Sequence, residues 1–258
     1  MRVDHQFAYS SVMAIEFVTI PFSHYCEKAR WALDRVGVTY IEHGHLPIFS
    51  RLATKRMGAG NTVPAVVADG KIVADSTAIV AWADARRPGA LLPTDANERA
   101  AALALEDTFD EQLGPATRRW AYYYLLPNKA VMRNVTANGV PTWQARTFRM
   151  FRPLAAGAIK RGLKIDTAGA ERSRQKIETV FAQVNALLAD GRRFLVGTSF
   201  SVADLAFASL AAPILVPPQQ KFGMAGPQIY AGEARAAVEA WRATPAGQFA
   251  LRMFATER

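Results

Sequence analysis

The residues best placed for chemistry lie where an apolar strand turns into a helix. Residues 15–20 are β-branched and aromatic, and Pro21 then removes a backbone donor and ends the strand. Apolar residues recur after it at helical spacing, at Cys26, Ala29, Leu33 and Val36. Gly37 ends this helix. Ser23 therefore lies at or next to a helix N-terminus, where free N–H groups and the helix dipole favour an anion.

The same corner carries the motif Ser-His-Tyr-Cys at residues 23–26, with Arg30 seven residues after Ser23. It is similar to the active-site corner of thioredoxin-like proteins, and it resembles the amino-terminal domain of glutathione transferases of the Ser and Cys classes. A second register would match residues 20–22 to the nucleophile-Pro-Phe triplet of some of those classes. That register puts the apolar Ile20 at the active position and misplaces Arg30, so we adopt the Ser23 register. The resemblance makes glutathione the expected co-substrate.

Glutathione must become a thiolate before it can attack an electrophile. A hydroxyl donor and helix N–H groups stabilise a thiolate and lower its pKa, and Ser23 is the predicted catalytic donor. The alternative is that Ser23 is only an N-cap. Cys26 lies on the apolar stripe of the helix, so we expect a buried, inert thiol. Because position 23 is not a cysteine, dithiol exchange is excluded.

The resemblance also assigns residues that hold glutathione. Val63-Pro64 matches the position where a cis-proline exposes the preceding backbone to the cysteinyl part of glutathione, although a trans-proline that starts a strand is the alternative. Asp75-Ser76 matches the acid-Ser pair that holds the γ-glutamyl end through its carboxylate, its hydroxyl and a helix N-terminus. Ser76 is equally a candidate for a plain N-cap.

The glycyl end of the expected site is less well matched. Asn61 and Thr62 occupy positions where the family often has a basic or amide residue near the glycyl carboxylate. The lysine of the family is absent here. Lys55 and Arg56 are the candidate replacements for its charge.

An aromatic cluster at residue 120 and residues 122–124 lies on the helix that faces the electrophile pocket in this family. Such clusters are more often core than ligand wall, so only part of it is expected to line the pocket. The predicted pocket residues are Phe22, His24, Trp120 and Tyr123. The histidines at positions 5, 24, 43 and 45 lack the spacing of a metal site, and no metal is predicted.

The predicted elements follow the order βαβ, loop, ββα. A second strand is predicted over residues 39–42, a short helix over 50–56, a hairpin with an Asp69-Gly70 turn over 63–74, and a helix over 77–83. This order is that of an α/β thioredoxin-like, glutathione-binding domain, placed at residues 14–88. A segment with two prolines and a glycine follows as a linker, and residues 97–258 are predicted to form an all-helical bundle domain.

Three helices stand out in the second domain. Residues 98–126 predict one long helix, which Gly114-Pro115 should kink or break. Residues 143–163 predict a weaker helix, and residues 170–190 a clear one. Ser201 and Asp204 then stand in the relation of a capping box at the start of a further helix, a signal that recurs in the helical domain of glutathione transferases.

Composition excludes several classes of protein. The chain has 258 residues, a formal net charge of +9 and 50% hydrophobic residues, which is typical of a folded globular protein. Its basic residues form no known nucleic-acid module. The longest apolar run, residues 205–216, is shorter than the ~20 residues that span a bilayer, and residues 1–13 lack the pattern of a signal peptide. One cysteine permits no internal disulfide, which fits a cytoplasmic location.

The predicted function is glutathione transfer to a small hydrophobic electrophile. The resemblance also implies a homodimer, and no nucleic-acid or membrane partner is expected. Two alternatives stay open: a non-catalytic protein of the same fold that binds a ligand or partner, and a glutathione-dependent isomerase or lyase.

Overall fold

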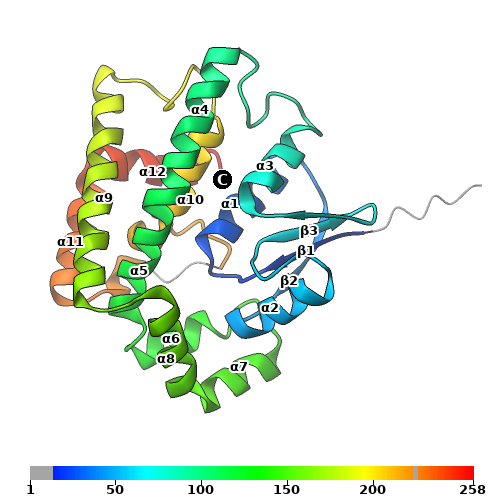
Figure 1. Ribbon diagram of the computed structural model, residues 1–258. Helices are drawn as coiled ribbons and strands as arrows, with labels where there is room; N and C mark the ends of the chain where they lie inside the picture. The colour runs from blue at the N-terminus through cyan, green and yellow to red at the C-terminus, as the bar shows by residue number, and fades with distance from the viewer. Residues whose placement is uncertain (1–13, 223–225) are drawn as a thin grey trace, which may run out of the picture.

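The computed structural model describes residues 14–222 and 226–258, and it consists of a small half built on a sheet and a larger helical half (Figure 1). Residues 1–13, for which the sequence predicts no signal peptide, lie outside the described residues. Within the described ranges, no helix is long and apolar enough to cross a membrane. The fold class predicted from the sequence, thioredoxin-like and then all-helical, is confirmed.

The sheet has four strands in the order β2-β1-β3-β4. The strands are β1 (Ile15–Thr19), β2 (Tyr40–Gly44), β3 (Ala65–Ala68) and β4 (Lys71–Ala74). β1 pairs in parallel with β2 and antiparallel with β3, and β3 pairs antiparallel with β4. Asp69 and Gly70 both have positive φ, of 52° and 71°, as the predicted two-residue hairpin turn requires. The turn fixes the register of β4.

Three helices complete the sheet-containing half: α1 (His24–Arg35), α2 (Pro47–Arg56) and α3 (Ser76–Asp84). α1 packs against α3 on one side and against the helical half on the other. The Pro47 ring lies in the first turn of α2, where its missing N–H costs no hydrogen bond. α2 begins earlier than the sequence pattern indicated.

In the described part of the helical half there are nine α-helices. They are α4 (Ala96–Thr108), α5 (Gly114–Leu125), α6 (Lys129–Val135), α7 (Thr142–Met150), α8 (Arg152–Leu163), α9 (Thr167–Leu187), α10 (Val202–Leu215), α11 (Gly232–Ala243) and α12 (Pro245–Thr256). Short 3₁₀ turns at Leu188–Asp190 and Pro227–Ile229 extend α9 and precede α11. α10 is the buried central helix, and α1, α4, α5 and α12 pack around it.

The long helix predicted over residues 98–126 is interrupted by a π-turn at Phe109–Leu113. The N–H of Gly114 bonds back to the Phe109 carbonyl, so the extra residue accommodates Pro115 without breaking the helical path. Figure 1 shows α4 continuing into α5 in one direction. The single helix predicted over residues 143–163 is instead two helices that meet at Phe151, because Pro153 permits only the start of a helix.

The predicted capping box at the start of α10 is confirmed. The Asp204 carboxylate accepts from the Ser201 N–H at 2.7 Å and, with its other oxygen, from the Leu195 N–H at 2.7 Å. Asp204 is fully buried, and burial raises its pKa to about 6. It therefore anchors the preceding loop as well as the helix.

The two halves share one hydrophobic core. The Trp31 ring of α1 lies 5.6 Å from the Phe200 ring and 4.8 Å from the Phe254 ring. Its indole N–H donates to the Glu257 carbonyl at 3.0 Å, across 226 residues of sequence. Arg258 forms ion pairs with two acidic residues of α1, one of them Glu27 at 2.7 Å. These contacts, which we call the α1–C-terminal clamp, fasten the last residues of the chain to its first helix.

Candidate active site

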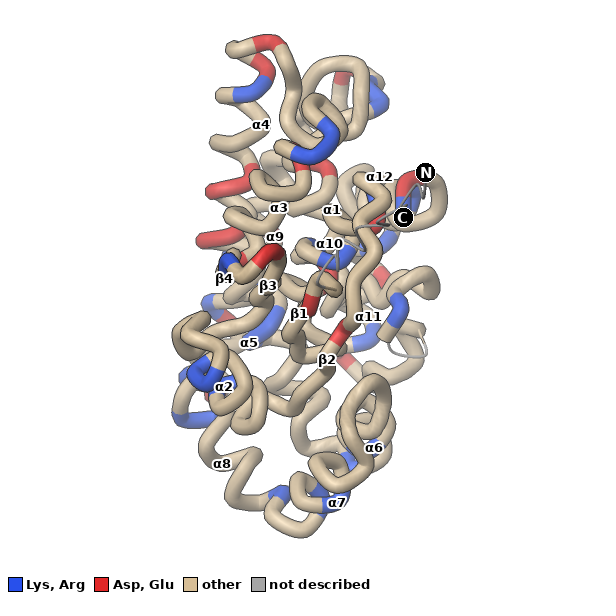
Figure 2. Tube along the Cα trace, turned by 90° about the vertical axis from the view of Figure 1, so that its right-hand side faces the viewer, with Lys and Arg blue, Asp and Glu red and all other residues tan. Residues whose placement is uncertain are grey.

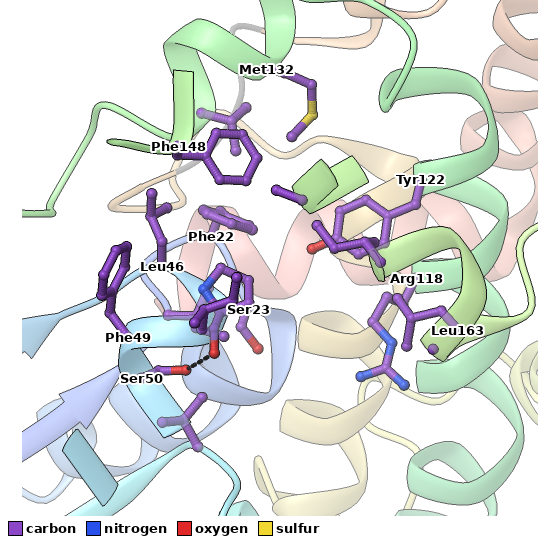
Figure 3. A pocket seen from close by; sticks show the side chains of 18 of the residues that line it. Phe22, Ser23, Leu46, Phe49, Ser50, Arg118, Tyr122, Met132, Phe148 and Leu163 are labelled. Carbon is purple, nitrogen blue, oxygen red and sulfur yellow. Dashed lines mark hydrogen bonds between the residues drawn. The ribbon is translucent and has the colours of Figure 1, made fainter. Parts of the chain in front are cut away.

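A cavity of about 670 Å³ lies between the two halves. One end is formed by the start of α1 and the turn before β3, and the rest by α2 and by helices α5–α8 (Figure 3). Apolar side chains dominate the α2 and α5–α8 walls, among them Leu46, Phe49, Leu125, Met132, Phe148, Ile159 and Leu163. The cavity can therefore take an apolar molecule, with polar groups confined to a few positions.

Ser23 is the N-cap of α1 and lines the cavity. Its backbone is extended, with φ −77° and ψ 128°, and its Oγ accepts from the Cys26 N–H at 3.5 Å. The N-cap reading is thus correct, and it is compatible with a second role, because the hydroxyl proton stays available to an anion at the same helix end. Phe22 and His24, on either side of it, line the cavity too.

Cys26 is fully buried, as the sequence predicts. Its Sγ accepts from the Ile20 N–H at 3.4 Å. Burial raises the pKa of the thiol to about 11, so it stays protonated at neutral pH. Arg30, also buried, is held by Glu27 and Glu42 and donates to the Pro21 carbonyl. Cys26 and Arg30 thus fix the corner that presents Ser23.

The peptide bond between Val63 and Pro64 is cis, as the resemblance implied. Val63, Asn61 and Thr62 line the cavity near Ser23. The N–H of Asp75 donates to the Pro64 carbonyl at 3.1 Å, which joins the start of α3 to this turn. Asp75 and Ser76 do not line the apolar cavity itself, but they lie directly next to its polar end.

Asp75, not Ser76, is the N-cap of α3. Its carboxylate accepts from the Thr77 N–H at 2.8 Å, and Ser76 is buried in the first turn. Asp75 has φ 85°, a conformation that costs a non-glycine residue of order 1–3 kcal/mol. Backbone strain of this kind is often found at functional sites.

An ion cluster ties the start of α3 to the helical half. The buried Lys28 ammonium lies 2.7 Å from Glu106 and 2.6 Å from Asp110, and the Thr77 hydroxyl lies within 2.9 Å of both carboxylates. One cation between two acids leaves one oxygen of each acid without a partner. This cluster holds the two halves together directly behind Asp75.

His24 is buried and its Nε2 lies 2.9 Å from the Gly114 carbonyl, so Nε2–H is the donor. Burial, together with the nearby Arg118 guanidinium, lowers the pKa of His24 to about 3. The ring is therefore neutral at physiological pH, and it joins α1 to α5 rather than acting as a base.

The sequence assigned the wrong faces of α5 to the cavity. Trp120 lies in the helical core, with its ring 4.8 Å from that of Trp241 and 4.7 Å from that of Tyr124. The Tyr123 hydroxyl shares a hydrogen bond with Thr167 on α9. The residues of α5 that line the cavity are Arg118, Ala121, Tyr122 and Leu125. Their spacing of three, one and three is that of a single helix face, but the sequence alone does not tell which face meets the cavity.

A basic residue of α2 also escaped the sequence analysis. Arg51 lines the cavity beside the turn at Asn61, whereas Lys55 and Arg56 do not. Arg51 lies one helical turn before Lys55 and so shares a face with it. The start of α2 at Pro47 was the missing information, because it decides which face of the helix meets the turn.

His43 and His45 are engaged with protein groups, and His5 lies outside the described residues. His43 pairs with Glu16, and the Gln144 amide donates to His45 at 2.9 Å. Among residues 14–222 and 226–258, no group of three or more His, Cys, Asp or Glu side chains could hold a metal ion.

Comparison with known families gives matches in both halves. The model of the glutathione S-transferase N-terminal domain matches residues 17–91, and that of the glutathione S-transferase C-terminal domain matches residues 167–243. Together they match more than half of the chain. No curated protein sequence matches it.

Solved structures share the fold at low identity. Glutathione transferase GSTFuA3 from Phanerochaete chrysosporium is 20% identical with a TM-score of 0.61, over 96% of this chain and 98% of its own. Glutathione S-transferase CsGST63524 of Ceriporiopsis subvermispora, in complex with glutathione, is 20% identical with a TM-score of 0.60. The match covers 95% of this chain and 98% of that protein's chain. Beta-etherase LigF from Sphingobium sp. strain SYK-6 is 20% identical with a TM-score of 0.58. The match covers 93% of this chain and 99% of that protein's chain.

Proposed function

The chain belongs to the glutathione S-transferase family, and we propose that it attacks a small hydrophobic electrophile with the thiolate of glutathione. One observation carries the proposal: the Ser23 hydroxyl and the N-terminus of α1 meet the cis-Val63 backbone at the polar end of a large apolar cavity. A thiolate bound there has donors on one side and room for an electrophile on the other.

The residues present fit the parts of glutathione. The cis-Val63 peptide offers backbone groups to the cysteinyl part, and the exposed Asp75 carboxylate can pair with the α-amino group. The N-terminus of α3 suits the α-carboxylate, and the exposed Arg51 suits the glycyl carboxylate. We therefore assign glutathione binding to residues 14–88, and the electrophile wall to residues 97–258 together with Leu46 and Phe49 of the α2 segment.

In the proposed mechanism, Ser23 donates its hydroxyl proton as a hydrogen bond to the sulfur while remaining the cap of α1. The donor and the helix end favour the charged form, and each unit of thiol pKa depression corresponds to ~1.4 kcal/mol of preferential thiolate binding. The neutral His24 and the protonated Cys26 take no proton in this scheme. The apolar walls exclude water from the bound electrophile.

The test is the ultraviolet absorbance of bound glutathione thiolate against pH. Wild type should show a thiol pKa well below the ordinary value of about 8.5, and Ser23→Ala should shift it upward. Cys26→Ala should titrate as wild type. An unshifted thiol pKa in the wild-type complex would remove Ser23 from its proposed role.

A glutathione-dependent lyase is the second candidate. The structural similarity to a protein named as a beta-etherase favours it, together with a cavity large enough for a two-ring molecule. Such a reaction uses the same thiolate and differs only in the group displaced. Turnover of an aryl halide against an aryl ether separates the two activities.

Two further parts of the proposal concern the setting of the protein. We infer a homodimer from family membership, and sedimentation of the purified chain tests it. A cytoplasmic location agrees with a single, buried cysteine, since secreted domains rely on disulfides. Fractionation of cells that express the tagged protein tests the location.

A further inference from the structure

Two polar side chains of α5 interrupt the apolar part of the cavity. Arg118 and Tyr122 lie four residues apart, so they occupy one face of the helix. Figure 3 shows them across the cavity from Ser23, with the Tyr122 hydroxyl directed inward. Around them the walls are apolar, formed by residues such as Leu125, Phe148 and Leu163. Two hydrogen-bond donors thus stand on one face of α5, and Arg118 is near enough to His24 to lower the pKa of that imidazole.

Arg118 has no partner in the part of the chain that the structure describes: no hydrogen bond or ion pair joins its guanidinium to another residue. Its neighbours contrast with it. Arg119 donates to the Leu163 carbonyl at 3.0 Å and to Ser173 at 3.2 Å, and Arg152 donates to two backbone carbonyls. Arg119 and Arg152 join helices through these hydrogen bonds, whereas Arg118 forms no such bond to the described residues.

Acidic residues are absent from the segment that surrounds Arg118, and Glu111 and Asp166 bound this segment. Residues 112–165 contain ten Lys and Arg and no Asp or Glu. Figure 2 shows Lys and Arg along α7 and α8, at the end of the molecule that closes the cavity. A partly buried guanidinium beside apolar walls is unfavourable unless an anion pairs with it. Because no carboxylate of the described residues pairs with Arg118, the anion of a ligand would supply the missing partner.

Tyr122 strengthens the same site as a neutral donor. Its side chain is half-buried, and burial raises the pKa of the phenol, so the phenol stays protonated at physiological pH. A planar guanidinium with a phenol one turn further along the helix presents several N–H and O–H donors to one acceptor group. That arrangement suits the two oxygens of a carboxylate.

We propose that Arg118 and Tyr122 bind a carboxylate on the electrophile, so that the substrates are apolar, ring-sized molecules bearing an acidic group. The apolar body lies against α7 and α8, and the reactive carbon points toward the thiolate at Ser23. The inference rests on the proposed function for the reaction, but the anion site itself does not depend on it.

The chemistry is a substitution. The thiolate sulfur forms a bond to the electrophilic carbon, the bond from that carbon to the leaving group breaks, and the leaving group departs with the electron pair. The thiol proton goes to solvent before attack. No oxidant, reductant or metal is required. The carboxylate of the substrate, which Arg118 binds, does not react.

The first test measures binding in the absence of glutathione. Calorimetry compares 2-naphthoate with 2-naphthamide, which has the same shape without the charge. Wild type should bind naphthoate about tenfold or more tighter, which corresponds to one charge-assisted pair. Arg118→Gln should abolish this preference, and Arg118→Lys should restore part of it.

Arg133→Gln is the matched control, because Arg133 is exposed on α6 and its loss changes the net charge equally without touching the cavity. It should keep the naphthoate preference of wild type. Equal affinity of wild type for both ligands, or a preference that survives Arg118→Gln, overturns the proposal. Unchanged thermal unfolding of Arg118→Gln excludes misfolding as the cause.

The second test measures turnover with 4-chloro-3,5-dinitrobenzoate and its carboxamide, from which the thiolate displaces chloride. Arg118→Gln should raise KM for the benzoate about tenfold or more and leave kcat, and both constants for the amide, nearly unchanged. Equal losses on both substrates, with a raised thiol pKa, would show that Arg118 serves the thiolate and would overturn the proposal.

The two tests separate the inference from the proposed function. If wild type prefers naphthoate but turns over neither substrate, the proposed function fails and the anion site stands. If it turns over both substrates with equal KM, the function stands and the inference fails.

Discussion

The two ends of the cavity are built in different ways. At the polar end, the functional groups are supplied by short segments: the cap of α1, the cis-Val63 peptide and the cap of α3. At the apolar end, α2 and α5–α8, with their capping residues, each contribute one residue to a separate small hydrophobic cluster of Leu46, Leu126, Met132, Phe148 and Ala155. The first end depends on backbone geometry, and the second on tertiary packing.

We infer that the polar end determines the reactivity of the thiolate and that the apolar end determines which electrophiles bind. Groups fixed by a helix terminus and a turn are preorganised for one charged atom, which suits a thiolate. A wall of apolar side chains is tolerant in shape, because hydrophobic swaps of similar volume cost little. Substitutions at the polar end should therefore act on kcat and on glutathione, and substitutions at the apolar end on KM for the electrophile.

The largest expected effect is that of Ser23→Ala on turnover. Removal of a donor to the thiolate should lower kcat by roughly one to three orders of magnitude. Cys26→Ala is the matched control, one helical turn away, and should leave kcat unchanged at a small cost in stability. Steady-state kinetics with an aryl halide measure both. The opposite result, with activity lost only in Cys26→Ala, would make this a cysteine enzyme.

The second largest effect is expected on the stability of the fold, at the buried Asp204 that caps α10. Asp204→Ala leaves the buried N–H groups of Leu195 and Ser201 without acceptors, so the free energy of unfolding should fall by about 2–3 kcal/mol. Urea unfolding measures the loss. Glutathione affinity of the folded variant should match wild type, and a weakened affinity at unchanged stability would contradict a structural role.

Asp75→Ala tests the glutathione side of the polar end. Loss of a charged partner should weaken glutathione binding by roughly 1–3 kcal/mol in calorimetry. Asp75→Gly loses the same carboxylate but accommodates φ 85° without strain, so it should be the more stable of the two variants. Unchanged affinity in both variants would remove Asp75 from the site.

The smallest effect is expected at the apolar end. Ile159→Ala removes part of the α8 wall and should raise KM for a neutral aryl halide a few-fold, on the order of 1 kcal/mol, with kcat unchanged. Kinetics at saturating glutathione isolate this change. A fall in kcat comparable to that of Ser23→Ala would erase the distinction between the two ends.

The same distinction explains how far the sequence could be interpreted. The polar end was predictable because its signals are local: a strand followed by Ser23 and a helical stripe, and a Val63-Pro64 pair before a hairpin. The capping box at Ser201 and Asp204, in the helical half, was predictable for the same reason. Each of these signals lies within one continuous stretch of the sequence. The fold class followed from the order of these signals.

The apolar end was not predictable, because the rotation of each helix about its own axis decides which of its side chains face the cavity. Trp120 is the largest aromatic on α5, and it faces the core that α9 and α11 complete. Arg118, two residues earlier, faces the cavity. Local propensity cannot decide between these faces. The π-turn rotates α5 about its axis, and the Gly114-Pro115 pair is the signal of this turn in the sequence.

The α1–C-terminal clamp has a consequence for the kinetics of folding. Trp31 and Glu257 are 226 residues apart, so their contact closes one of the longest loops the chain can form. Contacts of such high sequence separation are reached late, after local helices and the hairpin have formed. Until then the apolar face of α1 around Trp31 is uncovered. We expect refolding to end in a slow docking phase, during which the exposed face makes the chain prone to aggregation.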